Sequence, residues 1–219
     1  IDALLSHIGS DGITVEMAVA PIALAIASHP QLESFDLSSL RYIMWCATPV
    51  TPSIAEAVTA RTGVTWVTAY GASELPVLAC NDLIDARLDT VWRAPEGVRL
   101  RVVSLDTGEP LPAGEPGEIQ AQSDSVMAEY LPSEDSAAAF DDGWYRTGDV
   151  GYLDDDGYLR ITDRAKEMIK VRGFQVAPAE IEGVLLGHPA VRDCAVFGVP
   201  DFEDGEAVIA AVATCADVD

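Results

Sequence analysis

The sequence has 219 residues, 49% of them hydrophobic, and its 36 acidic and 13 basic residues give a formal net charge of −23. This apolar fraction argues against a disordered chain, and the negative charge argues against nucleic acid or anionic membranes as partners. The four cysteines form no C-x-x-C pair, which favours free thiols in a cytoplasmic setting.

The two ends of the sequence resemble cuts within a longer protein. The chain opens on Ile1 without an initiator Met and closes at Asp219 soon after a strand-like run. The longest apolar run, residues 17–27, is too short to span a membrane and is interrupted by Pro21. We therefore expect an internal fragment without a membrane span.

The first eighty residues alternate between predicted strands and helices. Apolar, β-branched runs predict strands at 14–19, 40–46 and 64–67. Helices are expected from Pro21 to about residue 29 and from Pro52 to about Gly63, because Pro favours the first turn and Gly the C-terminal cap. This alternation predicts an α/β fold with a largely parallel sheet covered by helices.

The pattern changes at about residue 90. Short strands at 98–105, 117–122, 148–153 and 158–162, separated by turn clusters, predict a mostly antiparallel β subdomain. After residue 164, a strand at 169–171, a helix at 178–186 and strands at 195–199 and 207–212 predict the start of a small α+β domain. We predict one domain over 1–163, made of an α/β part (1–90) and a β subdomain (91–163), and a truncated second domain over 164–219.

A ligand loop is predicted directly after the third strand, in the segment Tyr70-Gly71-Ala72-Ser73-Glu74. Ligands of open α/β sheets bind beyond the carboxyl ends of the strands. A ring, a flexible Gly, a hydroxyl and a carboxylate can stack on a base, bind a phosphate and hold Mg²⁺. Taken alone, the same segment also fits a turn with a tucked tyrosine.

Two further segments carry candidate polar groups. Asp149 begins a predicted strand, and the paired oxygens of its carboxylate can accept hydrogen bonds from both hydroxyls of a ribose; a β-turn Asp is the alternative. Residues 163–178 read DRAKEMIKVRGFQVAP and contain both lysines of the chain, Lys166 and Lys170. As a bare charge cluster this segment would be a solvated connector.

Together, and in this order, the three segments resemble the superfamily of acyl-CoA synthetases, peptide-synthetase adenylation domains and beetle luciferases. The sequence of residues 163–182 is most similar to the corresponding segment of 4-coumarate–CoA ligases and their bacterial acyl-CoA ligase relatives. The resemblance covers nearly the whole chain. It implies that residues 1–163 are the C-terminal portion of an AMP-binding domain and that 164–219 begin its C-terminal domain.

The resemblance assigns nucleotide-binding roles to the first segment. Tyr70 is expected to stack on adenine, Gly71 and Ser73 to lie at the AMP phosphate, and Glu74 to bind Mg²⁺. Thr48 falls in a turn that lines adenine in such enzymes, although Cys46 departs from the small residues usual there. Ser73 replaces a more usual Thr and keeps the hydroxyl.

The resemblance also assigns roles near the second domain. Asp149 is expected to bind the ribose and Arg164 the ribose or phosphate side. Lys166 matches the hinge about which the small domain rotates. Lys170 and Gly173 match a face that is presented during thiol transfer, where Gly lets the pantetheine arm pass close to the backbone.

The implied activity is ATP-dependent activation of a fatty or aryl carboxylic acid as acyl-AMP, with Mg²⁺, followed by transfer to CoA. The phosphate loop and the C-terminal catalytic lysine of such enzymes are not recognised in the sequence, so we expect the chain alone not to adenylate. Transfer to a carrier protein and a non-catalytic nucleotide-binding module are the alternatives. The acyl substrate and the oligomeric state are not predicted.

Overall fold

The computed structural model describes residues 1–46, 52–83, 87–88, 90–202 and 204–215. The chain divides into two compact units. The first unit comprises residues 1–101, 120–146 and 153–160, and the second comprises residues 102–119, 147–152 and 161–219. The predicted boundary between residues 163 and 164 stays a prediction.

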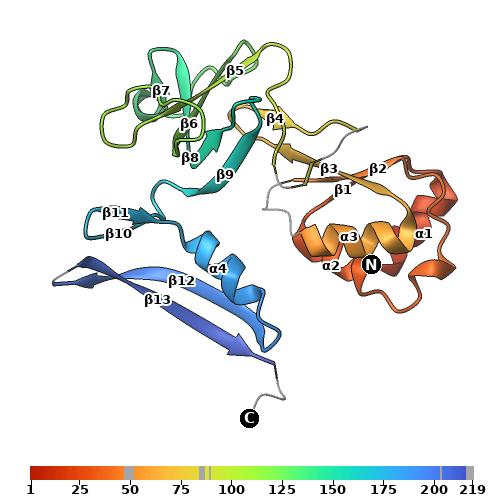
Figure 1. Ribbon diagram of the computed structural model, residues 1–219. Coiled ribbons are helices and arrows are strands. Elements are labelled where there is room, and N and C mark those ends of the chain that lie inside the picture. The colour runs from red at the N-terminus through yellow and green to blue at the C-terminus, as the bar shows by residue number, and fades with distance from the viewer. Residues whose placement is uncertain (47–51, 84–86, 89, 203, 216–219) are drawn as a thin grey trace. The chain divides into compact units, whose positions relative to one another are not determined.

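The N-terminal part of the first unit is a four-stranded sheet with helices, as predicted (Figure 1). The strands β1 to β3 are parallel, β4 is antiparallel to β3, and the sheet order is β1-β2-β3-β4. In chain order the elements are α1 (Asp2–Asp11), β1 (Val15–Ala18), α2 (Ala20–Ala27), the short 3₁₀ helix η1 (Leu32–Ser34), β2 (Tyr42–Trp45), α3 (Pro52–Thr62), β3 (Thr65–Tyr70) and β4 (Ala79–Cys80).

The core of this sheet is built on the two neighbouring strands β2 and β3. Trp45 and Trp66 are 1% and 2% exposed, and their rings pack with centroids 5.3 Å apart. The helices α2 and α3 pack on each other, and α3 packs on β3. Burying these large side chains stabilises the sheet that carries the predicted ligand loop at the end of β3.

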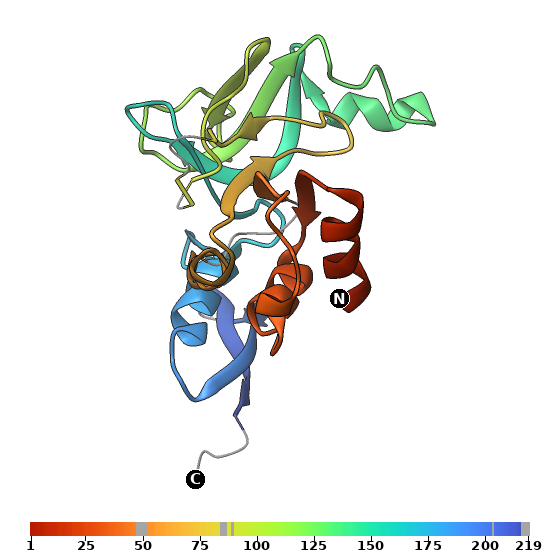
Figure 2. The same ribbon diagram turned by 90° about the vertical axis from the view of Figure 1, so that its right-hand side faces the viewer.

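Helix α1 was not predicted from the sequence, in which no element was expected before residue 14. Leu5 and Ile8 lie on one face of this helix and are each 1% exposed. Gly12 ends the helix with φ of 64°, and its N–H donates to the Ile8 carbonyl. Figure 2 shows α1, in dark red, leading into β1.

A second sheet contains five strands in the order β5-β6-β8-β7, with β9 paired to β8. The strands are β5 (Val98–Val103), β6 (Gly117–Ser123), β7 (Phe140–Asp141), β8 (Trp144–Leu153) and β9 (Leu159–Arg164), and the 3₁₀ helix η2 (Ser133–Ala138) precedes β7. The strand β8 begins four residues before the predicted strand at 148–153. The longer strand brings Thr147, Gly148 and Asp149 into one continuous element.

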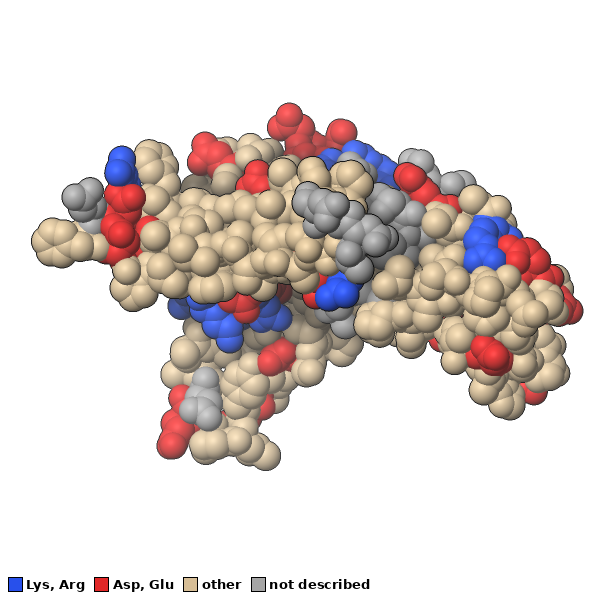
Figure 3. Space-filling model, turned by 90° about the horizontal axis from the view of Figure 1, so that it is seen from below, with Lys and Arg blue, Asp and Glu red and all other residues tan. Residues whose placement is uncertain are grey.

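The C-terminal part is a four-stranded sheet with one helix, in the order β11-β10-β13-β12. Its elements are β10 (Ile169–Val171), β11 (Phe174–Val176), α4 (Pro178–Leu186), β12 (Val191–Asp201) and β13 (Gly205–Thr214). The strands β12 and β13 expose Phe197, Ile209 and Val212, and Figure 3 shows few charges over them. Among the described residues, no helix is long and apolar enough to cross a membrane.

Candidate functional site

The loop that follows β3 is closed at its base by the backbone. Tyr70 is the last residue of β3 and pairs with Ala79 of β4, and the N–H of Leu78 donates to the Tyr70 carbonyl at 2.8 Å. The half-buried Tyr70 ring packs against a cluster that includes Leu75 and Leu78, which are 1% and 0% exposed. The loop is therefore anchored by buried apolar side chains.

Gly71 is required by the close approach of the loop to itself. A Cβ atom at this position would lie 2.0 Å from the carbonyl oxygen of Pro76. The N–H of Ala72 donates to the Leu75 carbonyl at 3.0 Å, which keeps the turn tight. Ser73, at the tip of this turn, is exposed, so its hydroxyl is accessible to a ligand.

Glu74 is held by a tyrosine that the sequence analysis missed. The Tyr130 hydroxyl donates to Glu74 Oε1 at 2.5 Å, and the Met127 N–H donates to the Glu74 carbonyl at 2.7 Å. The hydrogen bond to Glu74, followed by burial, raises the pKa of Tyr130 above its ordinary value of 10.0. The two residues are 56 positions apart, and no spacing in the sequence connects them.

Asp149 is buried in β8 and forms an ion pair with Arg164 of β9. Arg164 Nε lies 2.7 Å from Asp149 Oδ1; the Asp149 side chain is 12% exposed and that of Arg164 is 54% exposed. A buried carboxylate is stable only when its charge is compensated. Here the positive charge of the Arg164 guanidinium compensates the Asp149 carboxylate, and the Arg164 side chain remains partly exposed to solvent.

The backbone around Asp149 is fixed by buried hydrogen bonds. The Thr147 hydroxyl donates to the Ile119 carbonyl of β6 at 2.7 Å and accepts the N–H of Asp149 at 3.0 Å. Gly148 has φ of 70°, a conformation that L residues rarely adopt. Its carbonyl accepts the N–H of Ala165 at 2.8 Å, which ties β8 to the segment after β9.

Asp163, which received no role from the sequence, ties the segment after β9 to helix α4. Its Oδ2 accepts the N–H of Ala179, in the first turn of α4, at 3.1 Å, and its Oδ1 accepts the N–H of Arg164 at 2.7 Å. Ala177, the residue before the helix, makes no side-chain cap. The Asp163 carboxylate thus caps the N-terminus of α4, although it lies 16 residues before the N–H that it accepts.

The two lysines lie on exposed parts of the second unit. Lys166 occupies the turn between β9 and β10, and Lys170 lies in β10, where its N–H donates to Glu206 at 2.6 Å. Gly173 follows Arg172 in the two-residue turn between β10 and β11, with φ values of 85° and 50°. Positive φ at both positions is the requirement of a type I′ hairpin, which explains the glycine without a ligand.

The structure thus gathers the candidate residues in two groups. Tyr70, Gly71, Ser73 and Glu74 share one loop of the first unit. The Asp149–Arg164 pair lies in the second unit, as do Lys166, Lys170 and Gly173. Thr48 lies outside the described residues.

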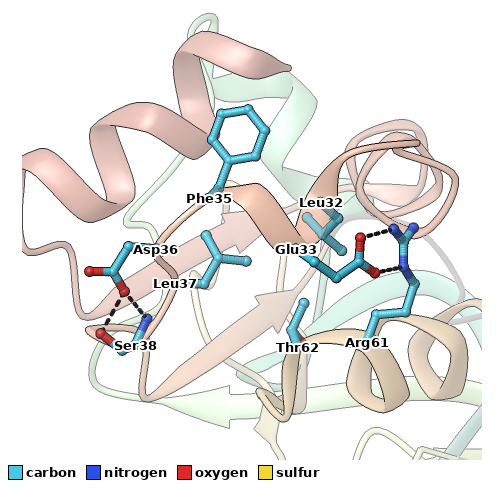
Figure 4. A pocket seen from close by; sticks show the side chains of 8 residues that line it. All are labelled: Leu32, Glu33, Phe35, Asp36, Leu37, Ser38, Arg61 and Thr62. Carbon is cyan, nitrogen blue, oxygen red and sulfur yellow. Dashed lines mark hydrogen bonds and ion pairs between the residues drawn. The ribbon is translucent and has the colours of Figure 1, made fainter.

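A cavity of about 360 Å³ lies elsewhere in the first unit and is lined by residues 32, 33, 35–38, 61 and 62. Arg61, one of the lining residues, donates two hydrogen bonds to the neighbouring Glu33 carboxylate, at 2.7 and 2.9 Å (Figure 4). The same guanidinium donates to the carbonyls of Ala27, the last residue of helix α2, and of His29, both at 2.7 Å. These contacts make Arg61 a structural cap, and none of the candidate residues lines this cavity.

The described residues contain no group of three or more His, Cys, Asp or Glu side chains that could hold a metal ion. Mg²⁺ needs no such group when a nucleotide is bound, because one or two carboxylates suffice when phosphates and water complete the octahedron. The half-buried carboxylate of Glu74, beside the exposed Ser73 hydroxyl, fits that limited donor set.

Comparison with known families shows to which family the chain belongs. A model described as AMP-binding enzyme matches residues 1–131, and one described as AMP-binding enzyme C-terminal domain matches residues 180–218. The chain belongs to the AMP-binding enzyme family. The predicted fold class, an α/β portion of an adenylate-forming enzyme, is thereby confirmed.

Individual members of this AMP-binding enzyme family are similar over nearly the whole chain. A 4-coumarate–CoA ligase-like protein of Oryza sativa subsp. japonica is 42% identical over 89% of this chain and 37% of its own length. The amide bond synthetase McbA of Marinactinospora thermotolerans is 37% identical, with a TM-score of 0.91 over 100% of this chain and 45% of that structure. The anthranilate CoA ligase AuaEII, in complex with anthranoyl-AMP, is 29% identical, with a TM-score of 0.86 over 100% and 42%.

The chain therefore spans roughly two fifths of the length of these relatives. Of the three relatives, one is named as a CoA ligase-like protein, one as an amide bond synthetase and one as a CoA ligase.

Proposed function

We propose that the full-length protein activates a carboxylic acid with ATP as an acyl-adenylate and transfers the acyl group to CoA. The observation that supports this most directly is the buried Asp149 carboxylate, compensated by Arg164, in a chain that matches a CoA ligase-like relative over nine-tenths of its length. A buried carboxylate on a rigid strand is a suitable acceptor for the two hydroxyls of a ribose.

The loop after β3 would bind the base and the phosphate end of the nucleotide. The Tyr70 ring is positioned by the apolar cluster at the end of β3, so one side can stack on adenine. The exposed hydroxyl of Ser73 can donate to an α-phosphate oxygen, and Gly71 permits the tight turn that places it. Glu74 would take part in holding Mg²⁺, which supplies positive charge to the phosphates as the carboxylate of the acid attacks.

In the reaction that we propose, the acid forms a new bond to the α-phosphorus of ATP and pyrophosphate leaves. The CoA thiol then attacks the acyl carbon, and AMP leaves as the thioester forms. Lys166 would serve as the hinge between these two steps. Lys170 and Gly173, on the hairpin β10–β11, would lie at the thiol during the second step.

An amine acceptor is a second candidate, because the amide bond synthetase McbA is 37% identical to this chain. The activation step is common to both candidates, and so is transfer to a carrier protein. The acceptor is decided by incubating the full-length protein with ATP, Mg²⁺ and a carboxylic acid, and by offering CoA, an amine or a carrier protein in parallel. We expect AMP and a thioester with CoA; an amide or a loaded carrier would replace the CoA assignment.

The nucleotide part of the proposal is tested by Asp149→Asn, with Asp155→Asn, at an exposed turn position, as the matched control. Loss of charge-assisted hydrogen bonds, worth about 1.5–3 kcal/mol, should weaken AMP binding roughly 10- to 100-fold. Calorimetric titration of AMP measures the effect. Equal AMP affinity in the two variants would exclude Asp149 as the ribose acceptor.

We further propose that the 219-residue chain alone does not adenylate, because neither the phosphate loop nor the C-terminal lysine is recognised in it. Carboxylate-dependent exchange of pyrophosphate into ATP by the purified chain would overturn this.

A further inference from the structure

The contact between Tyr130 and Glu74 joins two segments that are far apart in the sequence. The phenol donates to Glu74 Oε1 at 2.5 Å, within the first unit, and both side chains are half-buried. A hydroxyl that donates to a carboxylate makes a short, charge-assisted hydrogen bond, and such bonds are among the stronger ones in proteins. The contact is therefore suited to restrict the Glu74 side chain to one orientation.

Both partners of this contact are fixed by their own backbone. The Met127 N–H donates to the Glu74 carbonyl at 2.7 Å, and the Tyr130 N–H donates to the Ser136 hydroxyl oxygen at 2.7 Å. The loop on the other side is closed at Gly71, where an added Cβ would lie 2.0 Å from the Pro76 carbonyl oxygen. A donor that is fixed in this way orients a carboxylate at little entropic cost when a ligand arrives.

The chemical nature of the donor matters for a cation. A phenol is neutral, so it orients the carboxylate without adding positive charge that would repel Mg²⁺. In this contact the Tyr130 hydroxyl is the donor and Glu74 Oε1 the acceptor, so the carboxylate keeps its negative charge. The other candidate carboxylate, Asp149, is bound by the cationic Arg164, which suits neutral ribose hydroxyls and not a metal ion.

We infer that Tyr130 is a positioning residue, whose hydroxyl orients the Glu74 carboxylate toward the divalent cation that accompanies the nucleotide phosphates. This inference rests on the proposed function, since it needs a nucleotide at the loop after β3. It assigns a role to the segment 127–136, which carries none of the motifs of the sequence analysis. Tyr130 acts through Glu74 and does not itself contact the cation.

The test measures ATP binding by the full-length protein as a function of Mg²⁺ concentration, so that its readout does not depend on turnover. Tyr130→Phe removes one oxygen atom and should raise the Mg²⁺ concentration for half-maximal stimulation roughly tenfold, as outer partners of metal-binding carboxylates typically do. ATP binding in EDTA should be unchanged. Tyr158→Phe, at a half-buried tyrosine of the same unit, is the matched control and should behave as the wild type.

A double variant separates positioning from general structural damage. Glu74→Gln should itself weaken the Mg²⁺ stimulation, and adding Tyr130→Phe to it should change the Mg²⁺ dependence no further. A tenfold shift that persists in the Glu74→Gln background would overturn the inference, because Tyr130 would then act by another route. An unchanged Mg²⁺ dependence in Tyr130→Phe would overturn it as well.

Two further outcomes are distinguishable. If the wild type binds ATP without any stimulation by Mg²⁺ and shows no acid-dependent pyrophosphate exchange, the proposed function fails, and the inference fails with it. If the wild type shows both and Tyr130→Phe equals it, only the inference fails. Should Tyr130→Phe not fold, Ser136→Ala replaces it, because it removes the acceptor that fixes the Tyr130 backbone; a shift in the same direction supports the inference and its absence overturns it.

Discussion

A methyl group added at Gly71 has no room in the loop that follows β3. The new Cβ would lie 2.0 Å from the Pro76 carbonyl oxygen, and since real Cβ contacts do not fall below 3.0 Å, this backbone must retreat by about 1 Å. The turn also contains the hydrogen bond from the Ala72 N–H to the Leu75 carbonyl. Overpacking costs about 1–3 kcal/mol, and a lost backbone hydrogen bond about 0.5–1.5 kcal/mol, so we expect Gly71→Ala to destabilise the first unit by about 2–4 kcal/mol.

Urea unfolding followed by tryptophan fluorescence measures this loss, because all four tryptophans belong to the first unit. With a denaturant slope of about 1–3 kcal/mol/M, the midpoint should fall by roughly 1–2 M. The matched control is Gly183→Ala in helix α4, where the added Cβ meets nothing within 4 Å. Because Ala is favoured over Gly in helices by about 1 kcal/mol, this control should stabilise the second unit, as followed by circular dichroism. A Gly71→Ala midpoint equal to or above that of the wild type would refute the steric argument.

Three further predictions concern contacts outside the loop. Thr147→Val leaves a buried β6 carbonyl and the Asp149 N–H without their partner, so it should lower stability by about 1–3 kcal/mol, whereas Thr147→Ser should not; equal urea midpoints would contradict this. Asp163→Ala removes the acceptor of the first turn of α4 and should cost about 1 kcal/mol, seen as an earlier loss of helical circular dichroism; an unchanged transition would reject the capping role. Arg61 lowers the pKa of Glu33 from 4.5 to about 2, so the carboxylate contributes stability above pH 4.5 that is lost as the pH falls toward 2. The Tm difference between wild type and Arg61→Met should accordingly be constant above pH 5 and shrink below it; a difference that grows on acidification would show that Glu33 is not the partner.

Local signals in the sequence were sufficient to predict most of the helices and strands of the α/β part. Pro52 and Gly63 mark the ends of a helix, and α3 spans Pro52–Thr62 with Gly63 at φ of 70°. The apolar strands 40–46 and 64–67 became β2 and β3, because their tryptophans need a buried face. These predictions depend on neighbouring residues alone, which is why sequence patterns carry them.

The contacts that build the site could not be predicted from neighbouring residues in the sequence. Tyr130 meets Glu74 across 56 residues, and the Asp163 carboxylate reaches helix α4 across 16. Such contacts depend on how strands are ordered in a sheet, which periodicity does not encode. Helix α1 was missed for another reason: only Leu4, Leu5 and Ile8 mark its apolar face, and Ile1 provides no side-chain cap at its start.

The three segments together pointed to the family, and the structure supplied physical reasons for several residues of the third segment. Gly173 serves a two-residue hairpin with positive φ, and Asp163 caps a helix. The roles of Lys166 and Lys170 remain predictions, because both lie on exposed segments whose contacts do not identify a ligand.

The central claim is that the full-length protein forms an acyl-adenylate and passes the acyl group to CoA. Incubation with a panel of aryl and aliphatic carboxylic acids, ATP, Mg²⁺ and CoA, followed by quantification of AMP and thioester by mass spectrometry, tests it most directly. We predict AMP and thioester in equal amounts with at least one acid, dependent on CoA, and loss of both products in Asp149→Asn. Tight AMP binding without acid-dependent AMP formation from ATP for any acid in the panel would contradict the claim and indicate a non-catalytic nucleotide-binding module.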